Sequence, residues 1–158
     1  MTVIQQIAKH FRDVYFSGNW TSVNVKETLA DLSWQEATAT VGNLNTIATL
    51  VFHINYYVSP VFKVLQGGPL QASDKESFAL SPITSQSDWD ALVHKSLNDA
   101  EQFANEIEKL DEEKLFKDFA DAKYGNYYRN LHGIIEHTHY HLGQIVLIKK
   151  MLREKPVC

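Results

Sequence analysis

The sequence has 158 residues, of which 44% are hydrophobic, 22% charged and 11% aromatic, a size and composition typical of one globular domain. Its formal net charge is -4, and the absence of any long block of Lys and Arg argues against a nucleic-acid-binding protein. A small basic group lies at the end of a predicted helix, where cations interact favourably with the helix dipole; its members are Lys149, Lys150, Arg153 and Lys155. We predict a single domain over residues 1–158.

The N-terminus and the single cysteine indicate a cellular location. Residues 1–6 lack the basic and apolar regions of a signal peptide, and every apolar stretch is shorter than a membrane span. Cys158 is the only cysteine, so it cannot form an internal disulfide, and as the last residue it lacks the fixed geometry that a nucleophile needs. We therefore expect a soluble cytoplasmic protein with neither a membrane nor a nucleic-acid partner.

The first half of the chain predicts two long helices. Apolar residues at helical spacing predict the first from Val3 to about Phe16. A short helical piece is expected around Val23–Leu29, and the capping-box sequence at 33–36 predicts a turn of helix to Thr40. The second long helix is expected to start at 42–45 and to end near Leu65, before two glycines and a proline. Pro60 could kink it.

The second half predicts two more long helices. Residues 67–86 are rich in Gly, Ser, Pro and Gln and indicate a long connection. Ser85 or Ser87 with Asp88 supplies the start of the third helix, and the acidic segment 111–121 is expected to be solvated and irregular. The fourth helix is predicted from Asn126 to about Leu152. Four amphipathic helices and almost no strand-like alternation predict an all-α fold, a four-helix bundle.

Four of the seven histidines lie within residues 132–141, inside the fourth helix. At 100° per residue, His137 and His141 lie about 40° apart on the stripe that carries the apolar residues, whereas His132 and His139 face elsewhere. Two imidazoles at i and i+4 on an inward face are typical of a metal site. Gln144 lies on the same face as His137 and could orient a ligand histidine or a water, or form an interhelical hydrogen bond.

His53 is the natural third ligand, because it lies in the middle of the apolar stripe of the second long helix. Three imidazoles bind a divalent transition ion and leave positions open for water or substrate, as catalytic sites do. The alternative is that these are core histidines satisfied by hydrogen bonds.

Other catalytic patterns are absent. A zincin has Glu directly after its first His, but Thr138 follows His137, and Glu136 is expected to point about 100° away from the site. No nucleophile triad, glycine-rich phosphate loop or carboxylate pair is recognisable. Four tyrosines lie within or just before the predicted fourth helix: Tyr124, Tyr127, Tyr128 and Tyr140. We expect them mainly in the aromatic core, and the alternative is that they line a pocket or an interface.

The chain resembles the DinB/YfiT family of metal-dependent enzymes. The resemblance rests on residues 48–54 around His53 and on the motif Gly-Ile-Ile-Glu-His-x-x-x-His-x-Gly-Gln-Ile from Gly133 to Ile145, and it spans nearly the whole chain. Weaker similarities are Trp20, the Leu32-Ser33-x-x-x-Ala37 stretch and Asp88-Trp89. It implies a bundle with up-down-down-up topology, one nickel or zinc ion on His53, His137 and His141, and a homodimer.

Relatives in that family include S-transferases and isomerases that use low-molecular-weight thiols. The resemblance therefore implies a thiol-dependent S-transferase acting on a small-molecule substrate, with a low-molecular-weight thiol as cofactor. A metal-dependent hydrolase is the second hypothesis. The third is a non-catalytic helical module that works as a scaffold or binds partners.

Overall fold

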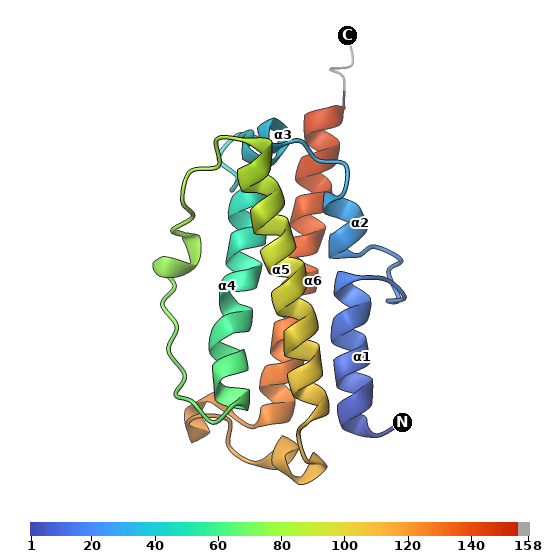
Figure 1. Cartoon of the computed structure of the whole chain (residues 1–158), viewed down its shortest axis with the longest axis vertical. Coiled ribbons are helices and arrows are strands. Elements are labelled where there is room, and N and C mark those ends of the chain that lie inside the picture. Colours follow the sequence, from blue (N-terminus) through green and yellow to red (C-terminus); the bar gives the residue numbers. More distant parts are fainter. Residues whose placement is uncertain (155–158) are drawn as a thin grey trace.

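The computed structural model describes residues 1–154 and is all-helical over that range (Figure 1). Four long helices form the body: α1 (Val3–Tyr15), α4 (Ile47–Leu65), α5 (Gln86–Glu108) and α6 (Tyr127–Arg153). Two short helices, α2 (Val25–Leu29) and α3 (Trp34–Thr38), lie between α1 and α4. Three 3-10 turns lie in the later connections: η1 (Glu76–Phe78), η2 (Glu112–Phe116) and η3 (Ala122–Tyr124).

The long helices pack side by side in a ring, in which α4 and α1 each contact both α5 and α6. α1 and α6 run towards the end of the bundle where α3 lies, and α4 and α5 run away from it (Figure 1). The two parallel helices α4 and α5 are joined by residues 66–85, which return along the length of the bundle and place η1 against α4. This return brings a loop segment beside the middle of α4.

Side-chain caps fix where the long helices begin. The side chains of Thr2, Ser85 and Asn126 accept hydrogen bonds from backbone N–H groups in the first turns of α1, α5 and α6. The predicted start of the second long helix was wrong, because α4 begins at Ile47 after its cap Thr46. Gly42 has a φ of 54° in the turn before it, a left-handed conformation that a helix start does not use.

Pro60 does not end α4, which continues through it to Leu65. The acidic segment at 111–121 contributes more to the core than the sequence predicted. Leu115 and Phe119 within it are 1% and 4% exposed, so two apolar side chains anchor a stretch whose charged neighbours face solvent. Burying apolar side chains is the main favourable term in folding, which explains why this segment closes over the end of the bundle.

Two of the stretches that resemble the family contact each other. The indole Nε1 of Trp89, a side chain only 1% exposed, donates a 3.1 Å hydrogen bond to the carbonyl of Leu32. Trp20, by contrast, is fully exposed.

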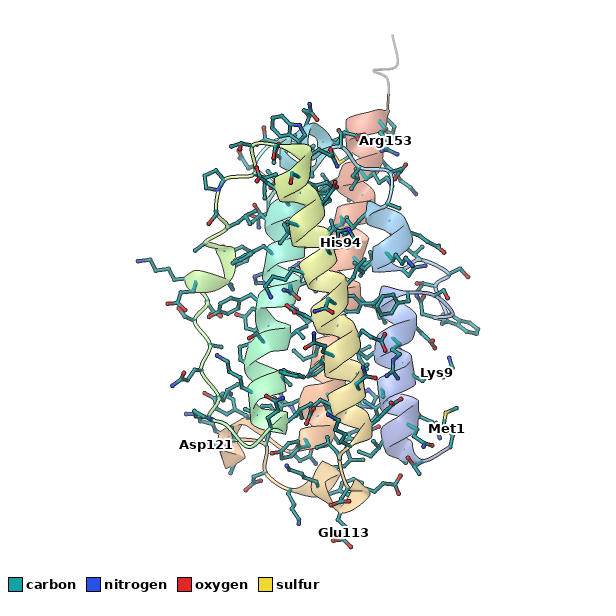
Figure 2. All side chains as sticks on the ribbon, in the orientation of Figure 1. Met1, Lys9, His94, Glu113, Asp121 and Arg153 are labelled. Atoms are coloured by element: carbon teal, nitrogen blue, oxygen red, sulfur yellow. The ribbon has the colours of Figure 1, made fainter. Side chains whose placement is uncertain are left out.

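Near α3, Arg153 at the end of α6 (labelled in Figure 2) donates to the carboxylates of Asp31 and Glu36. Lys149 also pairs with Asp31. Part of the basic group is therefore held in ion pairs within the chain.

Among residues 1–154, no helix combines the length and the apolar character that crossing a membrane requires. Lys155 and Cys158, about which predictions were made above, lie outside the described residues.

Candidate metal centre

Three histidines from two helices meet inside the bundle. His53 lies in the middle of α4, and His137 and His141 lie one turn apart on α6. Each ring offers one nitrogen, and these nitrogens lie within 4.8 Å of one another. His53 and His141 are 5% and 8% exposed, and His137 is half-buried. The structure thus brings the three predicted site residues close enough to hold a metal ion.

The tautomer of His53 is set by the connection between α4 and α5. The Oγ of Ser77 donates its proton to the carbonyl of Asp74 at 2.7 Å, so the 3.0 Å contact between this Oγ and Nδ1 of His53 requires the imidazole to donate. Ser77 is fully buried, which holds this arrangement away from water. The remaining nitrogen of His53, Nε2, therefore carries a free lone pair.

The tautomer of His141 is set in the same way by α6 itself. Nδ1 of His141 lies 2.7 Å from Oε1 of Gln144, an oxygen that can only accept, so Nδ1 carries the proton and Nε2 the lone pair. Gln144 therefore orients a candidate ligand, one of the roles considered for it. Hydrogen bonds of this kind to the outer nitrogen are typical of metal-ligating histidines.

The distances at the centre suit a metal ion. Nε2 of His137 lies 3.1 Å from Nε2 of His53. Metal–nitrogen bonds of about 2.0–2.1 Å place neighbouring ligand nitrogens about 2.8–3.4 Å apart in octahedral or tetrahedral geometry. A proton on Nε2 of His137 could bond to only one neighbouring lone pair, on His53 or on His141. One cation could instead accept the lone pairs of all three rings. The residues present therefore fit a divalent transition ion, for which imidazole is a suitable ligand.

Burial keeps two of these rings uncharged near neutral pH. Loss of solvent, and after it the neighbouring His141 and His53, together lower the pKa of His137 to about 4. The pKa of His53 is also lowered, first by burial and then by His141. A neutral imidazole is the form that binds a metal, so these two rings are ready to act as ligands.

Aromatic side chains enclose the histidines. The ring of Phe78 stacks on His53 with a centroid distance of 4.0 Å. The ring of Tyr57 makes edge contacts with both His53 and His137, at 5.2 and 5.1 Å. Tyr57 donates its hydroxyl proton to the carboxylate of Asp74, so the residues at 74–78 hold both a ligand ring and the tyrosine beside it.

A cavity of about 440 Å³ opens onto this centre between α4 and α6. His137 and Tyr57 lie in its wall, together with apolar residues of both helices. Glu136 also lines it. Such a volume lies within the usual range for a small-molecule site.

Tyr124 lines the same cavity and is 40% exposed, so the expectation of a core position was wrong for it and the alternative of a pocket position holds. Tyr128 and Tyr140 are also exposed, at 41% and 65%, and only Tyr127 is buried. The exposed tyrosines lie on turns of α6 and its flanking loop that face away from the bundle axis, which explains the difference.

Sequence reasoning missed the contribution of Ser77, Asp74 and Phe78. All three lie in the connection at 66–85, whose Gly- and Pro-rich composition indicates only a loop. Ser77 is 24 residues from His53 along the chain, and helical spacing cannot relate a loop residue to a helix at that separation. The one available signal was that a connection of this length between two parallel helices must travel back along the bundle.

Comparisons with family models, with curated proteins and with solved structures gave no match, so the functional argument rests on the site itself.

Proposed function

We propose that this protein is a metal-dependent enzyme in which His53, His137 and His141 hold one divalent ion, nickel or zinc. The observation that carries the proposal is the fixed protonation of two rings: Ser77 and Gln144 each hold a proton on Nδ1, which leaves Nε2 free as a ligand. Three protein ligands leave coordination positions open, as in catalytic rather than structural sites.

Membership of the DinB/YfiT family remains part of this proposal. The directions of the four long helices and the contact of Trp89 with Leu32 support it. The homodimer implied by the same resemblance stays a prediction.

Transfer of a low-molecular-weight thiol to a small electrophile is the first reaction that we propose. When bound, the ion would lower the pKa of a thiol or water in an open position and supply a nucleophile near neutral pH. The chain supplies the surroundings: the apolar residues of the 440 Å³ cavity offer a surface on which a substrate can pack, and Arg129 and Asn130 in that wall can hold a polar end of a substrate. The ring of Tyr57 packs against two of the three histidines and, with its hydroxyl held by Asp74, forms part of the wall that a reactant would contact.

A metal-dependent hydrolase is the second candidate, and Glu136 is the observation that favours it. Glu136 is one of the residues that line the cavity beside His137, and a carboxylate that reaches a water there could act as a general base.

Turnover assays on the metal-loaded full chain test the proposal. Thiols would be paired with epoxides and haloalkanes for the transferase, and ester and amide substrates would be used for the hydrolase. We expect turnover that is lost in His137→Ala and retained in His139→Ala, a histidine of the same helix outside the site. The absence of turnover in every assay, with metal bound, would support the non-catalytic module instead.

A further inference from the structure

The face of α6 that points away from the other helices is apolar over much of its length. The large hydrophobic side chains exposed on this helix are Tyr128, Tyr140, Leu147 and Met151. Three of them, Tyr140, Leu147 and Met151, lie within about 40° of one another around the helix and form its outer row. Within residues 1–154, α4 and α5 expose no large hydrophobic side chain and α1 exposes only Val3. Single exposed hydrophobic residues need no explanation, whereas a contiguous group marks an interaction site.

Gly143 lies beside this outer row, and nothing in the described part of the chain requires a glycine there. The residue is exposed, lies in the interior of α6 and does not have a positive φ. A Cβ added to it would meet no atom from elsewhere in residues 1–154 within 4 Å. A glycine inside a helix destabilises it relative to alanine, but it allows another backbone to approach closely. The reason for this glycine is therefore to be sought outside the single chain.

Two opposite charges flank Gly143 at equal distances on the same face. Glu136 and Lys150 lie seven residues before and seven residues after it, which is about 10.5 Å along the helix axis in each direction. At 100° per residue, each lies within about 20° of the direction of Gly143. Both are exposed, and neither forms an ion pair with any residue in the range 1–154. If two copies of α6 cross in opposite directions at Gly143, each Glu136 lies opposite Lys150 of the partner subunit.

The outer row matches itself in the same register. Tyr140 lies about one turn before Gly143 and Leu147 about one turn after it, on the same side of the helix. In an antiparallel pair, Tyr140 of each subunit therefore packs on Leu147 of the partner subunit. Such reciprocal contacts define an interface with two-fold symmetry. A crossing angle near 20°, a common value for packed helices, keeps the paired residues on facing turns.

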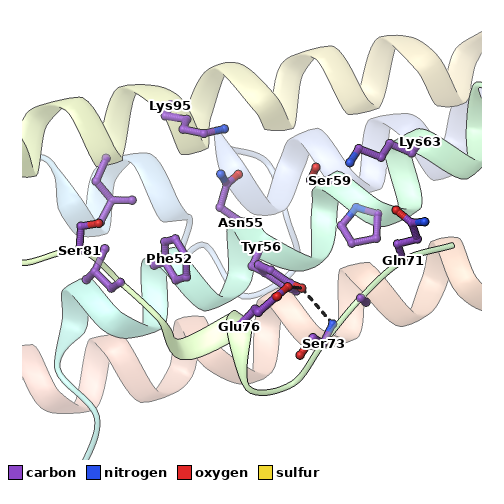
Figure 3. A pocket seen from close by; sticks show the side chains of 14 residues that line it. Phe52, Asn55, Tyr56, Ser59, Lys63, Gln71, Ser73, Glu76, Ser81 and Lys95 are labelled. Carbon is purple, nitrogen blue, oxygen red and sulfur yellow. Dashed lines mark hydrogen bonds between the residues drawn. The ribbon is translucent and has the colours of Figure 1, made fainter.

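We propose that the outward face of α6 is the interface of a symmetric homodimer, in which two copies of this helix cross antiparallel at Gly143. The charges select a second copy as the occupant, because opposite charges placed evenly about one residue are complementary to themselves. The side of the bundle between α4 and α5 differs, since it carries a cavity of about 830 Å³ with Lys63 and Lys95 in its wall (Figure 3). The inference uses neither the family resemblance nor the metal centre.

The same register brings the partner's helix to the edge of the cavity beside His137. Gly133 and Glu136 line that cavity. Met151 of the partner subunit lies on the turn that faces Gly133, where an added Cβ would also meet no atom from elsewhere in residues 1–154 within 4 Å. The second copy therefore supplies part of the rim of the cavity.

Sedimentation velocity on the full chain tests the interface. At about 100 µM a dimer of micromolar affinity is nearly complete, so we expect the mass of two chains for the wild type. Gly143→Gln places a long side chain at the crossing point, and this overpacking should weaken dimerisation by about 10- to 100-fold. The single chain should tolerate the change, because the space over Gly143 is open and glutamine is the better helix former. Ala91→Gln, at an exposed position of α5, is the matched control and should leave the dimer intact.

Charge reversal tests the register. Glu136→Lys or Lys150→Glu alone places like charges opposite each other twice in the dimer, and each should weaken dimerisation by about three- to thirtyfold. The double variant places opposite charges together again and should recover most of the affinity. Lys63→Glu is the matched control, because Lys63 is an exposed helical lysine outside any ion pair of residues 1–154, and it should change nothing.

Circular dichroism shows whether each variant is folded, and if Gly143→Gln is not, the charge variants still decide. The inference is overturned if the wild type sediments as a monomer at about 100 µM, which would leave this face to a different partner. It is also overturned if Gly143→Gln dimerises as tightly as the wild type, because the dimer would then use another surface. A double charge variant that dimerises no more tightly than the single ones would overturn the register and with it the choice of a second copy.

Discussion

Helix α6 carries two sets of histidines that look alike in the sequence and differ in the fold. His137 and His141 meet His53 of α4, with ring centroids 4.5–4.9 Å apart. His132 and His139 instead face His10 of α1, with centroids at 6.5 and 6.3 Å. Only the first set forms a group of nitrogens close enough to share an ion among residues 1–154.

The difference between the two sets lies in their surroundings, and their pKa values do not separate them. Burial lowers the pKa of His132 and His139, as it does for His53 and His137. In the first set, however, Ser77 and Gln144 hold Nδ1 of two rings, whereas no hydrogen bond from the described residues holds the rings of the second set. Convergence together with fixed tautomers therefore identifies a candidate metal site, and a lowered pKa alone does not.

The largest expected effect separates the two sets by thermal unfolding with added zinc or nickel. Metal at about 1,000 times its dissociation constant stabilises a folded protein by about 4 kcal/mol. For a chain of this size that corresponds to a rise of about 8–16 °C in Tm. We expect this rise in the wild type and in His139→Ala, and its loss in His53→Ala. An equal rise in His53→Ala would mean that the metal binds elsewhere.

Ser77→Ala should have the next largest effect. Removing the acceptor that holds Nδ1–H of His53 frees the ring to change tautomer, and partners of this kind typically account for a 10- to 100-fold change in metal affinity. Competition with a chromophoric chelator measures that change. Ser73→Ala is the matched control from the same connection, because no hydrogen bond joins its side chain to a histidine. Unchanged affinity in Ser77→Ala would remove this serine from the account.

Gln144→Leu should weaken metal binding by about tenfold, the lower end of the same range, because Gln144 is only partly buried and water can replace it in part. Gln144→Glu keeps an acceptor at that position and should retain most of the affinity. The same chelator competition applies. If Gln144→Glu lost as much affinity as Gln144→Leu, the amide would be acting through something other than the bond to His141.

The smallest effect concerns pH. The pKa of His137 is lowered to about 4, so the folded chain holds this ring neutral where the unfolded chain, with a pKa near 6.5, binds a proton. Stability of the metal-free protein should therefore fall as the pH drops from about 6.5 towards 4. Urea unfolding across that range should show a weaker pH dependence in His137→Gln. A stability that increases as the pH drops through this window would contradict the assignment.

The lowered pKa values also predict how many protons are released when metal binds. Protonated histidines would release protons when metal binds. Because the pKa values of His53 and His137 are lowered, these two rings should contribute little proton release at pH 7, and His137 should contribute more as the pH approaches about 4. Calorimetry in buffers of different ionisation enthalpy distinguishes the two cases.

The sequence allowed the helices and the three histidines to be predicted because both follow a local rule. Spacing on a helix relates His137, His141 and Gln144, and an apolar stripe places His53 inward. Ser77 followed no such rule, because its contact with His53 depends on how the connection at 66–85 returns along α4. The cap at Thr46 was missed for a different reason, since Gly42 supplied a stronger but misleading break signal.

Metal content of the untagged protein, measured by elemental mass spectrometry, tests the central claim most directly. The protein would be loaded with nickel or zinc, dialysed, and compared with His53→Ala, His137→Ala and His141→Ala, and with a variant in which His10, His132 and His139 are all changed to alanine. The account predicts about one ion per chain in the wild type and in the triple variant, and a loss in each of the three single variants. No retained metal in the wild type, or metal lost only in the triple variant, would contradict it.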